Sequence, residues 1–156
     1  MSDDFKINDA TYSGTKEVDQ NLKFDTNLLQ DWMHEHIPNC ESISSVEQFK
    51  GGQSNPTYKI LTKTGAYVLR RKPPGKLLPK AHAVDREYKV ISALEETDVP
   101  VPKTFGLCDD HDVVGTPFFM MEFVEGKVFW DHLLPSCSKT ERAQIYRDKN
   151  RVIAAL

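Results

Sequence analysis

The fold is decided by two segments, Phe49-Lys50-Gly51-Gly52-Gln53-Ser54-Asn55 and Tyr67-Val68-Leu69-Arg70-Arg71. The first lies between predicted strands at 44–50 and 57–62. Its adjacent glycines allow the backbone to approach a ligand closely. Exposed N–H groups of such a loop, together with the Ser54 hydroxyl, can hold phosphate oxygens. A plain hairpin with a Gly-Gly turn would have the same sequence, so the loop indicates a phosphate site only in combination with the second segment.

The second segment is a predicted strand that ends in two cations. Side chains alternate along a strand, so Val68 and Arg70 share one face while Arg71 lies on the other. If Val68 covers a flat ligand, Arg70 reaches its phosphates, with Arg71 as the fallback. A buried ion pair between Arg70 and Glu87, which lies in a predicted helix over 82–96, would orient the cation toward phosphate. The alternative is an exposed arginine and a solvated glutamate.

A third segment, Phe118-Phe119-Met120-Met121-Glu122-Phe123-Val124, is almost wholly apolar and predicts a buried strand. An extended chain that leaves a core strand also presents its backbone. The C=O of Glu122 and the N–H of Val124 could then pair with the edge of an adenine, with Met121 lining the pocket behind it. The structural and the ligand-binding interpretations are compatible.

The rest of the pattern predicts an α+β lobe, in which a five-stranded antiparallel sheet carries one main helix. The strands are expected at 44–50, 57–62, 66–71, 103–108 and 117–124, and the helix at 82–96 follows the third strand. A turn at 109–112 joins the last two strands. The domain boundaries that we expect are a mobile polar arm (1–24), a leading helix capped by Asp25 (25–40), the lobe (41–126) and the start of a second lobe (127–156). The S-x-x-E sequence at 138–141 predicts the beginning of another helix.

Charge is strongly segregated along the chain. The net charge is −3, but residues 50–90 carry 10 Lys and Arg against only Asp85 and Glu87. This positive block favours an anionic ligand held locally, and a merely solvated surface is the alternative. The acidic balance argues against nucleic acid as a partner. The three cysteines stand at wide, irregular spacing, which supports neither a disulfide framework nor a zinc site, and we expect no metal site.

Targeting signals are not evident. No run of about 18 apolar residues is present, so no membrane span is expected. The acidic start of the chain has neither an apolar core nor the arginines of a transit peptide. We therefore expect a cytosolic or otherwise reducing location.

In order, these elements resemble the small lobe of the kinase-like fold, and most of all the aminoglycoside phosphotransferase-like family. The resemblance covers residues 41–134. It rests on F-x-G-G-x-S-N, Y-V-L-R-R-K-P-P-G, R-E-Y in the helix, V-P-V-P and F-M-M-E-F-V-E-G. Similarity is greatest, across 51–75 and 117–130, to the kinase-like domain at the N-terminus of long acyl-CoA dehydrogenase family proteins, which leaves mitochondrial or peroxisomal locations open.

The resemblance implies a role for each matching residue. Gly51, Gly52, Ser54 and Asn55 would form the phosphate loop. Arg70 would replace the third-strand lysine, with Glu87 as its helix partner. Glu122 and Val124 would form the hinge, beside Val68 and Met121, which the strand patterns above place at the base. The cofactor implied is ATP with Mg, and the acceptor is a small-molecule hydroxyl such as that of a hydroxyacyl-CoA or an aminoglycoside.

Catalytic residues are the missing part of this resemblance. No His-x-Asp followed by Asn occurs in the sequence, and no G-x-G-x-x-G dinucleotide segment supports a dehydrogenase. We expect a lobe truncated before the larger second lobe and inactive alone. The alternatives are a non-catalytic interaction or regulatory module and a fragment of a longer acyl-CoA dehydrogenase-linked protein. We also expect an exposed face near Phe123, Phe129 and Trp130 to recruit a protein partner or a second copy.

Overall fold

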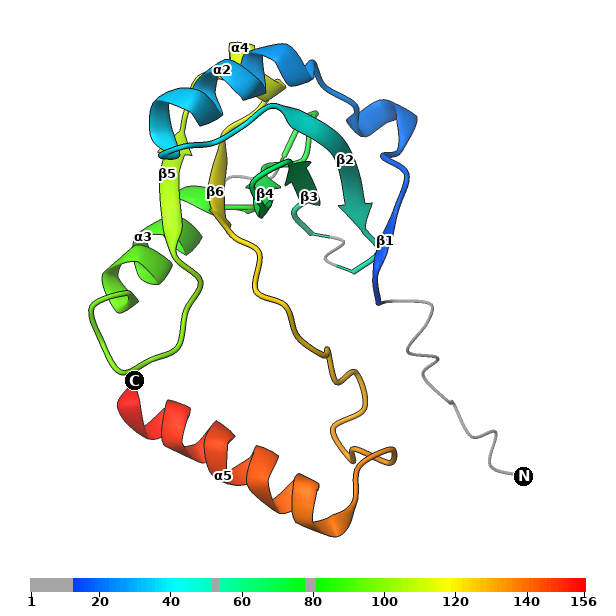
Figure 1. Ribbon diagram of the computed structural model, residues 1–156, viewed down its shortest axis with the longest axis vertical. Coiled ribbons are helices and arrows are strands. Elements are labelled where there is room, and N and C mark those ends of the chain that lie inside the picture. The colour runs from blue at the N-terminus through cyan, green and yellow to red at the C-terminus, as the bar shows by residue number, and fades with distance from the viewer. Residues whose placement is uncertain (1–12, 52–53, 78–80) are drawn as a thin grey trace.

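One antiparallel sheet organises the chain in this computed structural model, which describes residues 13–51, 54–77 and 81–156 (Figure 1). Its strand order is β1-β2-β3-β4-β6-β5. The strands are Thr15–Lys16 (β1), Ile43–Phe49 (β2), Thr57–Thr62 (β3), Ala66–Arg71 (β4), Thr104–Cys108 (β5) and Phe118–Glu122 (β6). All neighbouring strands pair antiparallel. The five strands expected from the sequence are present, within about two residues of their predicted ends.

The sixth strand comes from the segment predicted to be a mobile arm. Here the prediction was wrong for the described part of that arm, while residues 1–12 lie outside the described residues. The backbone N–H of Lys50 donates to Gly14 O at 3.1 Å, and Thr15 donates its hydroxyl to Glu47. The following 3-10 helix, Gln20–Leu22 (η1), is tied to β2 because Asp19 N donates to the side chain of Gln48 at 3.0 Å. Polar contacts with the edge of the sheet, together with the packing of Val18 and Phe24 against the core, therefore order a segment that has no apolar periodicity.

The first face of the sheet is covered by the helix Thr26–His36 (α2), which Asp25 caps as predicted by accepting from Asn27 N at 2.8 Å. Its buried side chains, Leu29, Trp32 and Met33, pack on the sheet. They meet the fully buried Tyr58, Ile60, Leu69, Phe118 and Met120. This is the main core of the lobe.

Between β5 and β6 the expected turn contains a short helix, His111–Val114 (α4). Asp110 caps it by accepting from Asp112 N at 2.9 Å. Gly115 ends it with φ +88°, a left-handed conformation that suits glycine. The hairpin was predicted correctly, but its turn is helical because an aspartate and a glycine stand at the cap positions. In Figure 1, α4 lies beside α2 at one end of the sheet.

The opposite face of the sheet carries the helix Val84–Leu94 (α3). Tyr88 of this helix packs near Phe119 of β6, with ring centroids 6.1 Å apart. Side-chain alternation also places Val68 and Arg70 on this face. α3 covers only part of the face, so the remainder is open to ligands.

The last helix, Lys139–Ala155 (α5), begins at the predicted capping box of Ser138 and Glu141. The hydrogen bond from Ser138 holds the pKa of the Glu141 carboxyl below its usual value. None of the residues of α5 is buried. Across the described residues, no helix combines the length and apolar character that crossing a membrane requires.

Candidate functional site

Three adjoining cavities lie on the α3 face and share wall residues. We call them the hinge cavity, of about 550 Å³, the central cavity, of about 690 Å³, and the helix cavity, of about 670 Å³. Phe49, Phe123 and Val124 line both the hinge and the central cavities. Arg70 lines both the central and the helix cavities. The three cavities therefore adjoin one another, and Arg70 stands between the central and the helix cavities.

The hinge cavity brings together four residues that the sequence predicted to hold a base: Val68, Met121, Glu122 and Val124. Val68 and Met121 are direct partners across β4 and β6. The opposite wall is the Pro100-Val101-Pro102 segment. The pairing of β6 ends where Glu122 N donates to Lys103 O at 2.8 Å. Beyond Glu122 the chain continues without regular secondary structure, and Val124 is 61% exposed.

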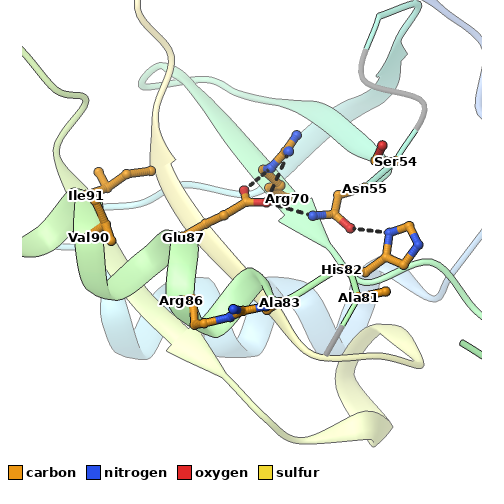
Figure 2. A pocket seen from close by; sticks show the side chains of 10 residues that line it. All are labelled: Ser54, Asn55, Arg70, Ala81, His82, Ala83, Arg86, Glu87, Val90 and Ile91. Atoms are coloured by element: carbon orange, nitrogen blue, oxygen red, sulfur yellow. Dashed lines mark hydrogen bonds and ion pairs between the residues drawn. The ribbon is translucent and has the colours of Figure 1, made fainter. Parts of the chain in front are cut away.

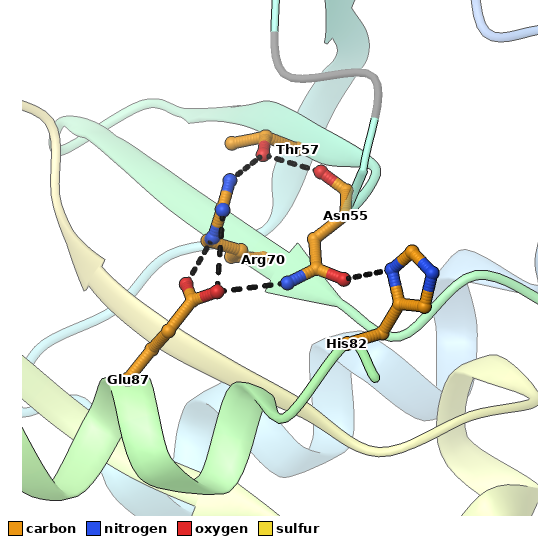
Figure 3. A network of polar contacts seen from close by, with 5 residues as sticks. All are labelled: Asn55, Thr57, Arg70, His82 and Glu87. Atoms are coloured by element: carbon orange, nitrogen blue, oxygen red, sulfur yellow. Dashed lines mark hydrogen bonds and ion pairs between the residues drawn. The ribbon is translucent and has the colours of Figure 1, made fainter. Parts of the chain in front are cut away.

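The ion pair predicted between Arg70 and Glu87 is present (Figure 3). The guanidinium donates from Nε to Glu87 Oε2 and from Nη2 to Glu87 Oε1, the latter at 3.3 Å. The side chains are 26% and 36% exposed, so the pair is half-buried rather than buried. Arg70 Nη1 also donates to the Thr57 hydroxyl at 2.9 Å. Partners on β3 and α3 thus hold the plane of the guanidinium in one orientation.

Asn55 closes this network from the side of the loop. It is only 3% exposed, and its Nδ2 donates to Glu87 Oε1 at 2.8 Å. Its Oδ1 accepts from His82 Nδ1 at 3.0 Å. The sequence predicted Asn55 as part of the phosphate loop, whereas its side chain joins the loop to α3 through Glu87. The helical periodicity of the sequence did not indicate a role for His82. In the structure this residue precedes α3, and its φ is +57°.

The glycine loop itself contributes to two cavities. Gly51 lines the central cavity, and the exposed Ser54 lines the helix cavity. Figure 2 shows Ser54 and His82 at one end of the helix cavity and Val90 and Ile91 at the other. Gly52 lies outside the described residues.

The fallback role of Arg71 was wrong. Arg71 points to the α2 face and is 3% exposed. It donates from Nη1 to Val114 O and from Nη2 to Leu22 O, both at 2.6 Å. The Tyr58 hydroxyl donates to the same Leu22 carbonyl, and burial raises the pKa of Tyr58. Arg71 is therefore a structural cation that joins η1 and α4 to the sheet.

An aromatic pair that the sequence did not indicate lines both the hinge cavity and the central cavity. Phe49, at the end of β2, stacks on Phe123, with ring centroids 6.3 Å apart and an interplanar angle of 21°. The ammonium of Lys59 lies 4.2 Å from the centre of the Phe123 ring. The two phenylalanines are far apart in sequence: Phe49 ends β2 and Phe123 directly follows β6, and these two strands are not neighbours in the sheet. Only the tertiary structure brings them together.

Among the residues that the structure describes, no three His, Cys, Asp or Glu side chains come together as a metal site. Cys40, Cys108 and Cys137 are free thiols, and burial raises the pKa of Cys108. The polar chemistry of the site in the described residues is therefore that of cations, hydroxyls and backbone N–H groups around a half-buried ion pair.

Comparison with known proteins places this site in context. The model of the phosphotransferase enzyme family matches residues 45–156. Acyl-CoA dehydrogenase family member 11 of Rattus norvegicus is 45% identical over 136 residues, which cover 85% of this chain and 18% of that protein. Acyl-CoA dehydrogenase family member 10 of Mus musculus is 44% identical over 109 residues, covering 70% and 10% of the two chains. The chain thus spans less than a fifth of the length of these relatives.

A solved structure shares the fold. The crystal structure of a protein from Ralstonia eutropha, provisionally named an aminoglycoside phosphotransferase, superposes with a TM-score of 0.72 at 49% sequence identity. The match covers 85% of this chain and 38% of that one. The two chains are therefore similar in sequence as well as in fold.

Proposed function

The chain belongs to the phosphotransferase enzyme family and has its kinase-like fold, and from that premise we propose that the described site binds ATP. The observation that carries the proposal is the adjacency of the three cavities, two of which share Arg70. A planar apolar group fits the hinge cavity, and a chain of anionic groups fits the cavities beside the cation. The size and chemistry of both parts match a purine nucleotide.

The residues present fit this cofactor. Val68 and Met121 supply an apolar lining for the base, and Glu122 and Val124 line the same cavity. Arg70, held by Glu87 and Thr57, supplies a fixed charge for phosphate oxygens. A pre-oriented cation loses little conformational freedom when the ligand binds. ATP, when bound with Mg, would supply the phosphoryl group for transfer to a hydroxyl acceptor.

The acceptor class follows from the family alone. Phosphotransferases that act on small molecules take a hydroxyl as the nucleophile, and we propose a hydroxyacyl-CoA or an aminoglycoside-like alcohol. Positioning of the nucleophile and the metal contributes most of the rate in phosphoryl transfer. No His-x-Asp followed by Asn occurs in this sequence. We therefore propose that this chain by itself binds nucleotide without turning it over.

The hinge provides a direct test of nucleotide binding. Val124→Pro removes one backbone N–H in a segment without regular secondary structure, and it should at least halve the rise in melting temperature produced by saturating Mg-ATP. Glu125→Pro is the matched control, since it introduces the same ring one residue further along and should preserve the rise. The measurement is thermal unfolding with and without Mg-ATP. If Mg-ATP causes no rise in the unmodified chain, the proposed function is wrong.

A second candidate, an interaction module, is favoured by the apolar residues after β6. Val124, Val128 and Leu133 are 61%, 56% and 74% exposed. Leu134, the next residue after Leu133, is buried at 4% exposure. We propose that Val124, Val128 and Leu133 associate with a second copy of the chain, since covering exposed apolar surface lowers the free energy.

Light scattering tests the association. The chain should form dimers or larger species at high concentration, and the double variant Val128→Asp with Leu133→Asp should be a monomer, because charge opposes burial. The matched control is Val90→Asp, on the exposed face of α3, which should leave the association unchanged. A monodisperse monomer of the unmodified chain at high concentration contradicts the proposal.

A further inference from the structure

The central cavity has a wall that neither the motifs nor the hinge accounts for. It is formed by the segment after β6, through Gly126, Lys127, Val128 and Trp130, and by Ser13 and Gly14 from the N-terminal side of β1. These two pieces of chain are joined, because Trp130 Nε1 donates to Ser13 Oγ at 2.9 Å. The contact spans 117 positions of the sequence. We call residues 126–130 together with Ser13 the outer wall.

The charged side chains that line the central cavity are all positive. Its lining includes two cations, Arg70 from the sheet and Lys127 from the outer wall, and no carboxylate side chain. The helix cavity, in contrast, includes Glu87 beside its cations. A cavity lined by two cations and no carboxylate suits a ligand with several anionic oxygens.

Two contacts of the residues that follow Lys127 in the chain position its side chain. Its ammonium lies 5.2 Å from the centre of the Phe129 ring. The Trp130–Ser13 hydrogen bond anchors the segment that carries it to β1, and β1 is itself paired with β2 next to the glycine loop. Glu141 interacts electrostatically with Lys127. Its carboxylate already accepts a hydrogen bond from the backbone N–H of Ser138 at 2.7 Å. The lysine is therefore held near the cavity without a committed carboxylate partner in the described network.

We propose that Lys127 is the second phosphate-binding cation of the site and that the Trp130–Ser13 hydrogen bond positions it opposite Arg70. This inference rests on the proposed nucleotide site and adds to it the class of group, a polyphosphate chain, that the central cavity takes. Arg70 approaches this chain from the sheet and Lys127 from the outer wall. Trp130 and Ser13 are positioning residues, since they act through the segment that bears Lys127.

Three probes separate the contribution of the phosphates from that of the base: Mg-ATP, inorganic tripolyphosphate and adenosine. Lys127→Ala should weaken the binding of Mg-ATP and of tripolyphosphate about tenfold, as expected for the loss of one charge-assisted contact. It should leave adenosine binding unchanged. Lys63→Ala, in the exposed turn between β3 and β4, removes the same charge away from the cavities and should change none of the three affinities. Calorimetric titration of the full chain measures all of them.

The positioning role has its own readout. The sequence has two tryptophans, and Trp32 is buried in the core at 8% exposure, so a change in emission on adding tripolyphosphate reports Trp130. Ser13→Ala should reduce this change and weaken tripolyphosphate binding about threefold. Trp130→Phe should weaken it by a similar factor. The double variant should be no weaker than either single variant, because both remove the same hydrogen bond.

The outcomes distinguish this inference from the proposed function. If Mg-ATP binds and Lys127→Ala behaves like Lys63→Ala, Lys127 is not a phosphate-binding residue and the inference is overturned while the nucleotide site stands. If Ser13→Ala and Trp130→Phe have independent, additive effects, the positioning role is overturned. If the unmodified chain binds neither Mg-ATP nor tripolyphosphate, both proposals are wrong.

Discussion

Replacing Arg71 by methionine is expected to lower the free energy of unfolding by about 2–4 kcal/mol, the largest loss of stability that we predict for a single polar residue of this lobe. Methionine keeps the apolar stem but removes the donors to Leu22 O and Val114 O. A buried carbonyl left without a partner costs about 1–3 kcal/mol, and this cost falls on Val114 O, because Leu22 O keeps the hydrogen bond from the Tyr58 hydroxyl. One gain offsets part of this cost, because the buried Nε of Arg71 has no hydrogen-bond partner.

The measurement is urea unfolding at equilibrium, and the neighbouring cation is the control. Arg70→Met makes the same substitution one position earlier on the same strand. It should cost less than about 1 kcal/mol, since half-exposed ion pairs contribute little to stability. Equal losses for the two variants, or a loss below about 1 kcal/mol for Arg71→Met, would show that Arg71 does not hold η1 and α4 to the sheet.

Arg70→Met is expected to have the opposite effect: the chain should still fold, but its affinity for nucleotide should fall strongly. Hydrogen bonds to charged groups contribute about 1.5–3 kcal/mol. Loss of about 2–3 kcal/mol in binding corresponds to about 30- to 150-fold weaker affinity for Mg-ATP. The effect is large because Glu87 and Thr57 already orient the guanidinium.

Calorimetric titration with Mg-ATP checks this prediction, and Glu87→Gln provides a graded comparison. Glutamine keeps the size of the side chain but removes the charge that orients Arg70. Its affinity for Mg-ATP should fall between that of the unmodified chain and that of Arg70→Met, about three- to tenfold below the former. Unchanged affinity in Arg70→Met would show that the phosphates do not approach this face of β4.

Much of the lobe could be predicted because its signals are local. Strands β3 and β4 have their predicted bounds, and the Lys63-Thr64-Gly65 turn between them is closed by a hydrogen bond from Thr62 N to Gly65 O at 2.9 Å. Asp25 and Ser138 cap the helices that they were expected to cap. In each case the stabilising partner lies within a few positions, so that the pattern of residues contains both partners.

Features that the sequence did not indicate depend on partners far apart along the chain. The edge strand β1 has only two residues, too few for any alternation, and it exists because Gly14 and Thr15 bond to β2. The stacking of Phe49 on Phe123 and the Trp130–Ser13 hydrogen bond likewise join distant segments. Asn55 was predicted from its place in the glycine loop, but its bonds to Glu87 and His82 depend on where α3 lies.

The two adjacent arginines distinguish what the local sequence determines from what depends on tertiary packing. Sequence alone determined that Arg70 and Arg71 lie on opposite faces, because side chains alternate along a strand whatever surrounds it. Only the tertiary structure decided which of them is buried. Contacts with η1 and α4 bury Arg71 on one face, whereas α3 covers the other incompletely and leaves Arg70 at the edge of two cavities. Alternation is a property of the local backbone, whereas burial is set by long-range packing.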